Sequence, residues 1–239
     1  MSPRGAGPSL SGGMLPQPDL TTCGPTCLHA VYRHLGEQLP LEQVIHEVPT
    51  LPMGGTLAVC LANHALARGY RARLYTFNLE VFDPTWMDLL PGEMIDRLDK
   101  RIARRRGRRF REAALAYREY LVRGGEISME DLSVELVRRP LDAGAPVIAG
   151  VSATYLYREK REIPETNQPD DVAGEPAGHF VVLTAYDPAT HEFEIADPLQ
   201  PNPLAPGPSY FVDARRTLTA VLLGILTYDA NLLLLRPGR

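Results

Sequence analysis

Residues 17–28 read QPDLTTCGPTCL and contain two of the three cysteines of the chain, Cys23 and Cys27. After this stretch, apolar side chains recur at helical spacing from Cys27 through Val31, and Gly36 follows where a helix would end. A proline two residues after Cys23 fits the first turn of such a helix. The stretch therefore predicts a helix that begins close to Cys23.

The two cysteines could form a metal site or a disulfide, or serve thiol chemistry or packing. A zinc site would need two more ligands, and the chain offers no second paired-ligand motif. A disulfide between positions one helical turn apart is geometrically awkward. Cys23 lies at the first turn, where free N–H groups and the positive end of the helix dipole stabilise a thiolate, whereas Cys27 lies on the apolar face. We expect Cys23 to be reactive and Cys27 to pack in the core, although this stretch alone leaves a buried structural role open for Cys23.

A cysteine nucleophile needs a base, and the base needs an acceptor that orients it. Of the six histidines, four lie in or near helical patterns and His191 lies in or beside a hairpin turn. His179 instead begins the apolar strand HFVVLTAY, and the following strand, HEFEIADP, ends near Asp197. If the two strands pair around the intervening DPAT turn, His179 and Asp197 meet at one end of the sheet. In that position a carboxylate can orient an imidazole.

The order of the expected elements indicates an α+β fold, because helices come first and mainly antiparallel strands follow. Helices are expected at about residues 23–35, 41–47, 56–68, 129–143 and 213–223, and strands at about 70–77, 146–157, 179–186, 191–198 and 231–237.

Residues 79–131 differ in character, with a long and strongly charged helical pattern. Eight of the twelve residues from Lys100 to Arg111 are Lys or Arg. A solvated helix face with intrahelical ion pairs is one interpretation, and docking of an acidic protein or peptide is another. Nucleic-acid binding is the less favoured use, because few aromatic residues for base stacking accompany the run. The hypothesis carried forward is that an acidic substrate or partner binds four arginines: Arg104, Arg105, Arg108 and Arg109.

Three blocks of the sequence resemble the double-glycine leader peptidases, the cysteine peptidases that process bacteriocin precursors, and their free-standing papain-like relatives. QPDLTTCGPTCLHAVYRHLG resembles the family's nucleophile motif, with Gln17 six residues before Cys23 as in the family. GGTLAVCLANHALARGYRARLY resembles the helix and strand that come next. GHFVVLTAYD resembles the family's histidine strand, and Asp197 begins an Asp-Pro pair that matches its aspartate motif, 18 residues after His179. The stretch between Cys23 and His179 is longer than in the family, and the excess falls on the charged segment.

The resemblance implies a papain-like cysteine peptidase that acts on peptide or isopeptide bonds. Cys23 would attack the carbonyl, His179 would take and return the proton, and Asp197 would orient His179. The Gln17 amide would stabilise the oxyanion together with the Cys23 backbone N–H. No metal and no organic cofactor are implied, and the expected partner is a peptide or protein substrate. Two alternatives stay open: a thiol acyltransferase or amidase on the same triad, and a non-catalytic papain-like module that binds through the basic segment.

The composition bounds these interpretations. The chain has 239 residues, 44% hydrophobic and 23% charged, with a net charge of -4, which is typical of a globular protein and predicts no general attraction to nucleic acid. An odd number of cysteines and the lack of a signal-peptide pattern or a long apolar run favour a cytoplasmic protein away from membranes. Residues 1–14, rich in Gly, Pro and Ser, are expected to be disordered. Residues 15–239 are expected to form one peptidase domain with a charged helical insertion at about 79–131.

Overall fold

The structure is a computed structural model that describes residues 10, 13–51, 54–227 and 230–238. Its helices are α1 (Cys23–His34), α2 (Leu41–Glu47), α3 (Ala58–Ala67), α4 (Pro91–Arg104), α5 (Arg108–Val122), α6 (Val134–Asp142), α7 (Ala153–Tyr157) and α8 (Ala214–Leu223). Its strands are β1 (Arg71–Thr76), β2 (Glu126–Ser128), β3 (Val147–Ser152), β4 (Glu162–Ile163), β5 (Gln168–Pro169), β6 (Gly178–Asp187), β7 (Glu192–Ala196), β8 (Ser209–Asp213) and β9 (Asn231–Arg236).

Seven strands form one sheet in the order β2-β1-β9-β3-β6-β7-β8, and β4 and β5 form a separate small ribbon. Only the β1–β2 pair of the large sheet is parallel, and every other neighbouring pair is antiparallel. The sheet is therefore mixed but mostly antiparallel, and the expected α+β class is confirmed.

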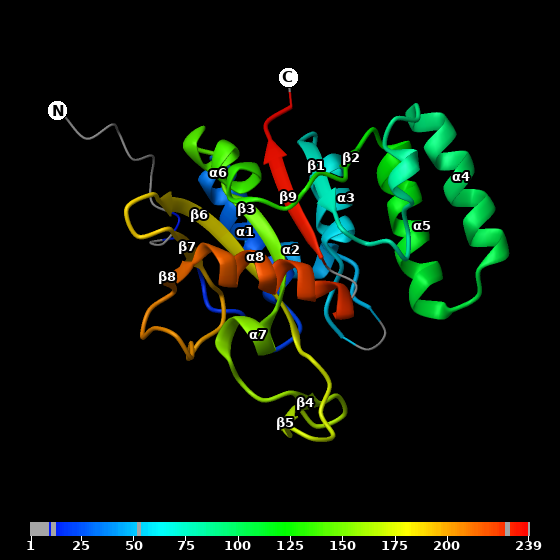
Figure 1. Ribbon diagram of the computed structural model, residues 1–239. Helices are drawn as coiled ribbons and strands as arrows, with labels where there is room; N and C mark the ends of the chain where they lie inside the picture. Colours follow the sequence, from blue (N-terminus) through cyan, green and yellow to red (C-terminus); the bar gives the residue numbers. More distant parts are fainter. Residues whose placement is uncertain (1–9, 11–12, 52–53, 228–229, 239) are drawn as a thin grey trace.

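Helices cover both faces of the large sheet (Figure 1). The helices α1 and α3 pack on one face, while α6 and α8 pack on the other. Strand β9 shows why both faces are apolar: Leu233 and Leu235 belong to the first core cluster, and Leu232 and Leu234 to the second. Since side chains alternate across a strand, a continuous apolar run such as LLLL suits a strand that is buried on both sides.

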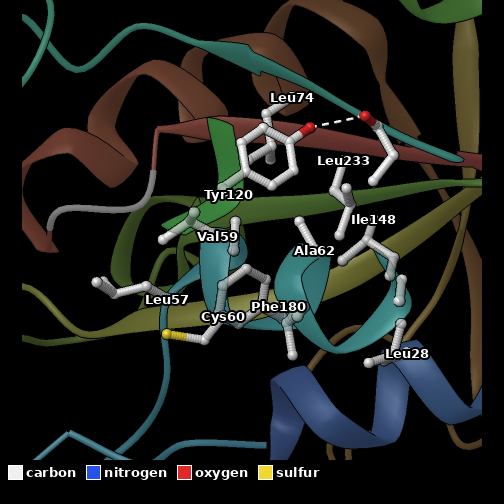
Figure 2. Packing of buried hydrophobic residues seen from close by; sticks show 14 of the residues in the cluster. Leu28, Leu57, Val59, Cys60, Ala62, Leu74, Tyr120, Ile148, Phe180 and Leu233 are labelled. Carbon is white, nitrogen blue, oxygen red and sulfur yellow. Dashed lines mark hydrogen bonds between the residues drawn. The ribbon is translucent and has the colours of Figure 1, made fainter. Parts of the chain in front are cut away.

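The charged segment contains two helices, α4 and α5, which lie beside the β1–β2 end of the sheet (Figure 1). The break between them falls at Gly107, whose φ of 128° is accessible mainly to glycine. The inner face of α5 packs against α3, and the Tyr120 hydroxyl donates to the backbone oxygens of Ala72 at 2.7 Å and Glu126 at 2.9 Å. Figure 2 shows Tyr120 among the buried residues of this core. The pair of helices is thus anchored to the sheet through buried contacts.

Most of the predicted elements are confirmed, with two corrections. The helix expected from about residue 129 begins at Val134, where the Ser133 side chain accepts from the backbone N–H of Leu136 and caps it. Residues 153–157, predicted as the end of a strand, form the helix α7 instead. The Ser152 side chain accepts from the backbone N–H of Tyr155 and caps this helix, a local hydrogen bond that competes with strand pairing. Four strands were not predicted, because each is short: β2, β4, β5 and β8.

At the N-terminus, residues 1–9, 11 and 12 of the segment expected to be disordered lie outside the described residues, while Leu10 and Met14 are buried in the core. Within the part of the chain that the structure describes, no helix is both long enough and apolar enough to cross a membrane.

Candidate active site

Cys23 is the first residue of α1, and 7% of its surface is exposed. The start of this helix packs against Thr56 and against Phe180 of β6. A Cβ atom added at Gly24 would lie 2.6 Å from Thr56 Cγ2 and 3.1 Å from Phe180 Cδ2, so a larger residue would force a shift at this contact. Because Phe180 follows His179 on β6, the contact brings the Cys23 end of α1 to the His179 end of β6.

His179 and Asp197 form a buried pair, with His179 Nε2 2.9 Å from Asp197 Oδ1. The predicted hairpin is confirmed, since β6 and β7 pair in antiparallel register and bring the two residues to one end. A carboxylate can only accept, so Nε2 carries the hydrogen and Nδ1 is the nitrogen left for Cys23.

The charges of the pair stabilise each other. Burial disfavours the imidazolium, but the negative charges of Asp197 and Cys23, with hydrogen bonds to both side chains, outweigh it and raise the pKa of His179 to about 10. Burial also opposes ionisation of Asp197, but the His179 charge and the hydrogen bonds to the carboxylate outweigh it and lower the pKa of Asp197 to about 2. At neutral pH the pair therefore consists of an imidazolium and a carboxylate.

Asp197 is fully buried and has three donors besides His179. Its Oδ1 accepts from the backbone N–H of Leu199 at 2.9 Å, and its Oδ2 accepts from the hydroxyls of Tyr157 at 2.7 Å and Tyr210 at 2.5 Å. Sequence reasoning missed both tyrosines. A buried carboxylate requires hydrogen-bond donors, so the sequence indicates that donors to Asp197 exist. It does not indicate which residues they are.

Gln17 lies beside this pair. Its backbone N–H donates to the oxygen of Pro198 at 2.9 Å, which ties it to the loop that carries Asp197. Its side-chain Nε2 donates to Asp19 O at 2.8 Å, and its Oε1 is buried and accepts no hydrogen bond from any described residue. One N–H of the side-chain amide is thus left for another acceptor.

Cys27 packs in the core as expected, with no exposed surface and its thiol donating to Phe180 O at 3.2 Å. Burial raises the pKa of the Cys27 thiol well above its ordinary value, and the charges of Cys23 and Asp197 add to this. Cys60, on α3, is 8% exposed, and none of the three cysteines is in a disulfide.

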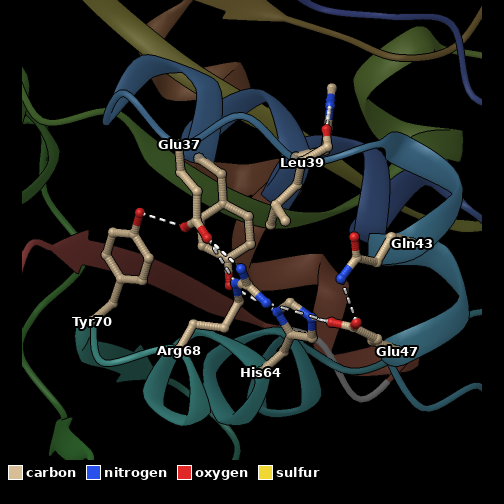
Figure 3. Close-up of polar contacts among 9 residues, drawn as sticks. Glu37, Leu39, Gln43, Glu47, His64, Arg68 and Tyr70 are labelled. Atoms are coloured by element: carbon tan, nitrogen blue, oxygen red, sulfur yellow. Dashed lines mark hydrogen bonds and ion pairs between the residues drawn. The ribbon is translucent and has the colours of Figure 1, made fainter.

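A second buried histidine, His64, also contacts a carboxylate, and both of its ring nitrogens have partners in a structural network. Its Nε2 lies 2.9 Å from Glu47 Oε2 and its Nδ1 lies 2.8 Å from the Tyr32 hydroxyl. Figure 3 shows this group joined to a neighbouring one, in which Glu37 accepts from Arg68 and Tyr70. The network links the end of α1 to α2 and α3, so His64 has a structural role in this part of the core.

A cleft of about 520 Å³ opens beside the His179–Asp197 pair. Gln17, Tyr157 and His179 line it, together with residues of the 51–57 segment, the N-terminal end of α5 and the loop that carries β4 and β5. Its charged lining residues are Arg108, Arg109, Glu112, Glu159, Lys160, Glu162 and Glu175.

The four candidate arginines divide into two groups. Arg108 and Arg109 line the cleft. Arg105 instead contacts the Glu80 carboxylate and lies over the Phe110 ring, 4.8 Å from its centroid. Arg104 is exposed and does not belong to the cleft lining of the described residues. Among the described residues, no group of three or more His, Cys, Asp or Glu side chains is arranged to hold a metal ion.

Residues 13–204 match the model of the Peptidase_C39 like family, and the chain therefore belongs to this family. A putative C39-like peptidase from Bacillus anthracis has a similar solved structure, with a TM-score of 0.51, 14% identity and 95% of each chain covered. The predicted family and its papain-like fold are thus confirmed.

Two further solved structures show weaker similarity. One is a double glycine motif protease from an AMS/PCAT transporter in complex with the leader peptide, with a TM-score of 0.44, 14% identity, and 94% of this chain and 91% of that chain covered. The other is the peptidase domain of Streptococcus ComA, a bi-functional ABC transporter, with a TM-score of 0.46, 15% identity, and 94% of this chain and 97% of that chain covered. No curated protein matches the chain.

Proposed function

We propose that this member of the Peptidase_C39 like family is a cysteine peptidase that hydrolyses a peptide or isopeptide bond. Cys23 is the nucleophile, His179 the acid and base, and Asp197 the residue that orients His179. The observation that carries the proposal is the buried 2.9 Å contact between His179 and Asp197, with Cys23 close enough to hydrogen-bond the same imidazole. Nucleophile, base and orienting acceptor are the three parts that thiol catalysis requires.

The reaction uses the ion pair of a Cys23 thiolate and the His179 imidazolium. The sulfur attacks the substrate carbonyl carbon, and the imidazolium passes its proton to the departing amine. Water then attacks the acyl-enzyme, gives a proton to His179 and releases the thiolate and the new carboxyl group. The unused N–H of the Gln17 amide and the Cys23 backbone N–H stabilise the oxyanion at both steps.

The substrate is a peptide or protein segment that enters the cleft beside His179. Residues 79–131 form an insertion in the peptidase domain and place Arg108 and Arg109 in the cleft wall. From this position, the two arginines bind an acidic side chain of the substrate. Long elaborations on a rigid scaffold commonly carry specificity rather than chemistry.

Alkylation tests the nucleophile without a known substrate. Cys60 is a matched internal control, since it is 8% exposed and Cys23 is 7% exposed. At pH 6.5, iodoacetamide should modify Cys23 at least about tenfold faster than Cys60, because the thiolate is the reactive form. His179→Ala should reduce the Cys23 rate to that of Cys60, with site occupancy measured by mass spectrometry of peptides. Equal rates at both cysteines in the wild-type protein would remove the proposed nucleophile.

Hydrolysis itself is tested with a peptide library in water enriched in oxygen-18. A peptidase incorporates the label into each new carboxyl terminus, whereas transfer to an added amine leaves the acyl product unlabelled. The label should appear with the wild-type protein and be absent with Cys23→Ala. Products that carry only the amine would show the transferase alternative instead.

A further inference from the structure

We infer that Tyr157 and Tyr210 are positioning residues that hold the Asp197 carboxylate in the orientation that directs Oδ1 to His179. The expected effect of the two tyrosines on kcat rests on the proposed function. Their effect on the geometry of the His179–Asp197 pair does not.

The two oxygens of Asp197 have separate sets of donors. Oδ1 accepts from His179 Nε2 and from the backbone N–H of Leu199, each at 2.9 Å. Within the described residues, both donors to Oδ2 are side-chain hydroxyls: that of Tyr157 at 2.7 Å and that of Tyr210 at 2.5 Å. Tyr157 comes from α7 and Tyr210 from β8, so two independent elements fix the far oxygen of the carboxylate.

The direction of these hydrogen bonds follows from the chemistry of the groups. An ionised carboxylate only accepts, so each tyrosine must donate. Burial first, and then the Asp197 charge, raise the pKa of both tyrosines far above the ordinary value, which keeps their hydroxyls protonated. A fully buried carboxylate is costly unless its lone pairs are used, and these two donors satisfy the oxygen that His179 leaves open.

The position of Oδ2 decides the position of Oδ1, because both belong to one rigid plane. Without the tyrosine hydroxyls, rotation of the carboxylate would let Oδ2 compete with Oδ1 for the remaining donors, and the contact with His179 would lose its fixed geometry. The Tyr157 ring also lies near His179, with 6.0 Å between centroids, and forms part of the cleft wall. Substitution by phenylalanine keeps the ring and removes only the hydroxyl.

The test uses Tyr157→Phe, Tyr210→Phe and the double variant, with Tyr120→Phe as a matched control. Tyr120 is also buried, and its hydroxyl also donates to acceptors in the core, but these are backbone oxygens near β1 and β2. Two readouts are taken for each variant: kcat and KM with a peptide found in the library, and the proton resonance of His179 Nε2–H in protein labelled with nitrogen-15. The resonance needs no substrate.

Each single variant should lower kcat by about tenfold to a hundredfold, as when the hydrogen-bond partners that orient metal ligands are removed, and leave KM unchanged. The His179 Nε2–H resonance should move upfield and exchange faster with water, since its hydrogen bond to Asp197 weakens. Tyr120→Phe should lower stability and change neither readout.

A wild-type kcat and an unchanged resonance in both folded single variants would overturn the inference. If the wild-type protein shows no turnover that depends on Cys23, the proposed function fails, and the resonance still decides whether the tyrosines position Asp197. If the resonance shifts equally in Tyr120→Phe, the effect is a general consequence of lost core hydrogen bonds, and the inference is wrong.

Discussion

At the scale of single residues, two residues of the same type have different contacts, and therefore different roles, because their surroundings differ. Cys23 and Cys27 are one helical turn apart, yet Cys23 contacts an imidazole while Cys27 donates its thiol proton to a backbone oxygen. His179 and His64 both contact carboxylates. The other ring nitrogen of His64 lies 2.8 Å from the Tyr32 hydroxyl, whereas His179 interacts with Cys23. The position of Cys23 at a helix start and of His179 at a strand start allowed both residues to be singled out from the sequence. Tyr157 and Tyr210 were not predictable, because nothing local marks the distant residue that donates to a buried carboxylate.

Charge coupling between His179 and Asp197 should appear in the pH dependence of stability. The pKa of His179 is raised to about 10 from an ordinary value of 6.5, so its contribution to the free energy of unfolding is complete below pH 6.5 and is lost as pH rises to about 10. Asp197→Asn removes the largest interaction that raises this pKa. We expect the decline in the free energy of unfolding between pH 6.5 and 10 to be smaller in the variant, measured by urea denaturation across that range. An identical decline in both proteins would contradict the coupling.

At the scale of elements, the site depends on how closely α1 approaches β6. Sequence patterns predicted both elements and the β6–β7 hairpin, because each has a strong local period. They did not predict the distance between them, which depends on the missing side chain at Gly24 and on the side chains of Thr56 and Phe180 from two other segments. They also did not separate α4 from α5 or identify α7, since a helix break at Gly107 and a cap at Ser152 are single-residue signals inside longer apolar or charged runs.

Gly24→Ala tests this close approach. The new Cβ would overlap Thr56 Cγ2 and press on the Phe180 ring of β6, so the start of α1 should shift away from both and carry Cys23 with it. We expect the free energy of unfolding to fall by roughly 1–3 kcal/mol, the usual cost of overpacking. Cys23 alkylation at pH 6.5 should also slow toward the Cys60 rate. Both quantities are measured on the same purified variant.

Two further variants control for the alanine itself. Thr56→Ser deletes the methyl group that the added Cβ would meet and keeps the hydroxyl that donates to Pro49 O at 2.8 Å, so combining it with Gly24→Ala should restore part of both losses. A Cβ at Gly92 would meet no atom within 4 Å, and Gly92→Ala should leave alkylation unchanged. If Gly24→Ala behaves like Gly92→Ala, the close approach does not position Cys23.

At the scale of the whole molecule, the cleft joins segments that are far apart in the chain: the loop before α1, the start of α5, and the loop with β4 and β5. The basic run was visible in the sequence, but its orientation was not, because a helix with charges on several sides can face the cleft with any of them. The packing of α5 on α3 and the sheet settles that orientation, and it brings Arg108 and Arg109 to the cleft while Arg105 contacts Glu80.

This division of the arginines gives a prediction for substrate binding. Arg108→Gln with Arg109→Gln should raise KM for a peptide with acidic side chains by about tenfold and change kcat little. The substrate and the transition state would lose the same binding free energy, while the reacting groups stay in place. Arg106→Gln with Arg111→Gln is the matched control, since it removes the same charge from exposed positions of the same segment that do not line the cleft.

The salt dependence of KM tests the same two arginines. The wild-type KM should rise between low salt and 0.1 M salt, where charges are screened over roughly 10 Å, and this rise should shrink only in the Arg108 and Arg109 variant. Equal KM values for the two double variants would show that the arginines act only through the general charge of the segment, or not at all, and the cleft would then recognise its substrate by other contacts.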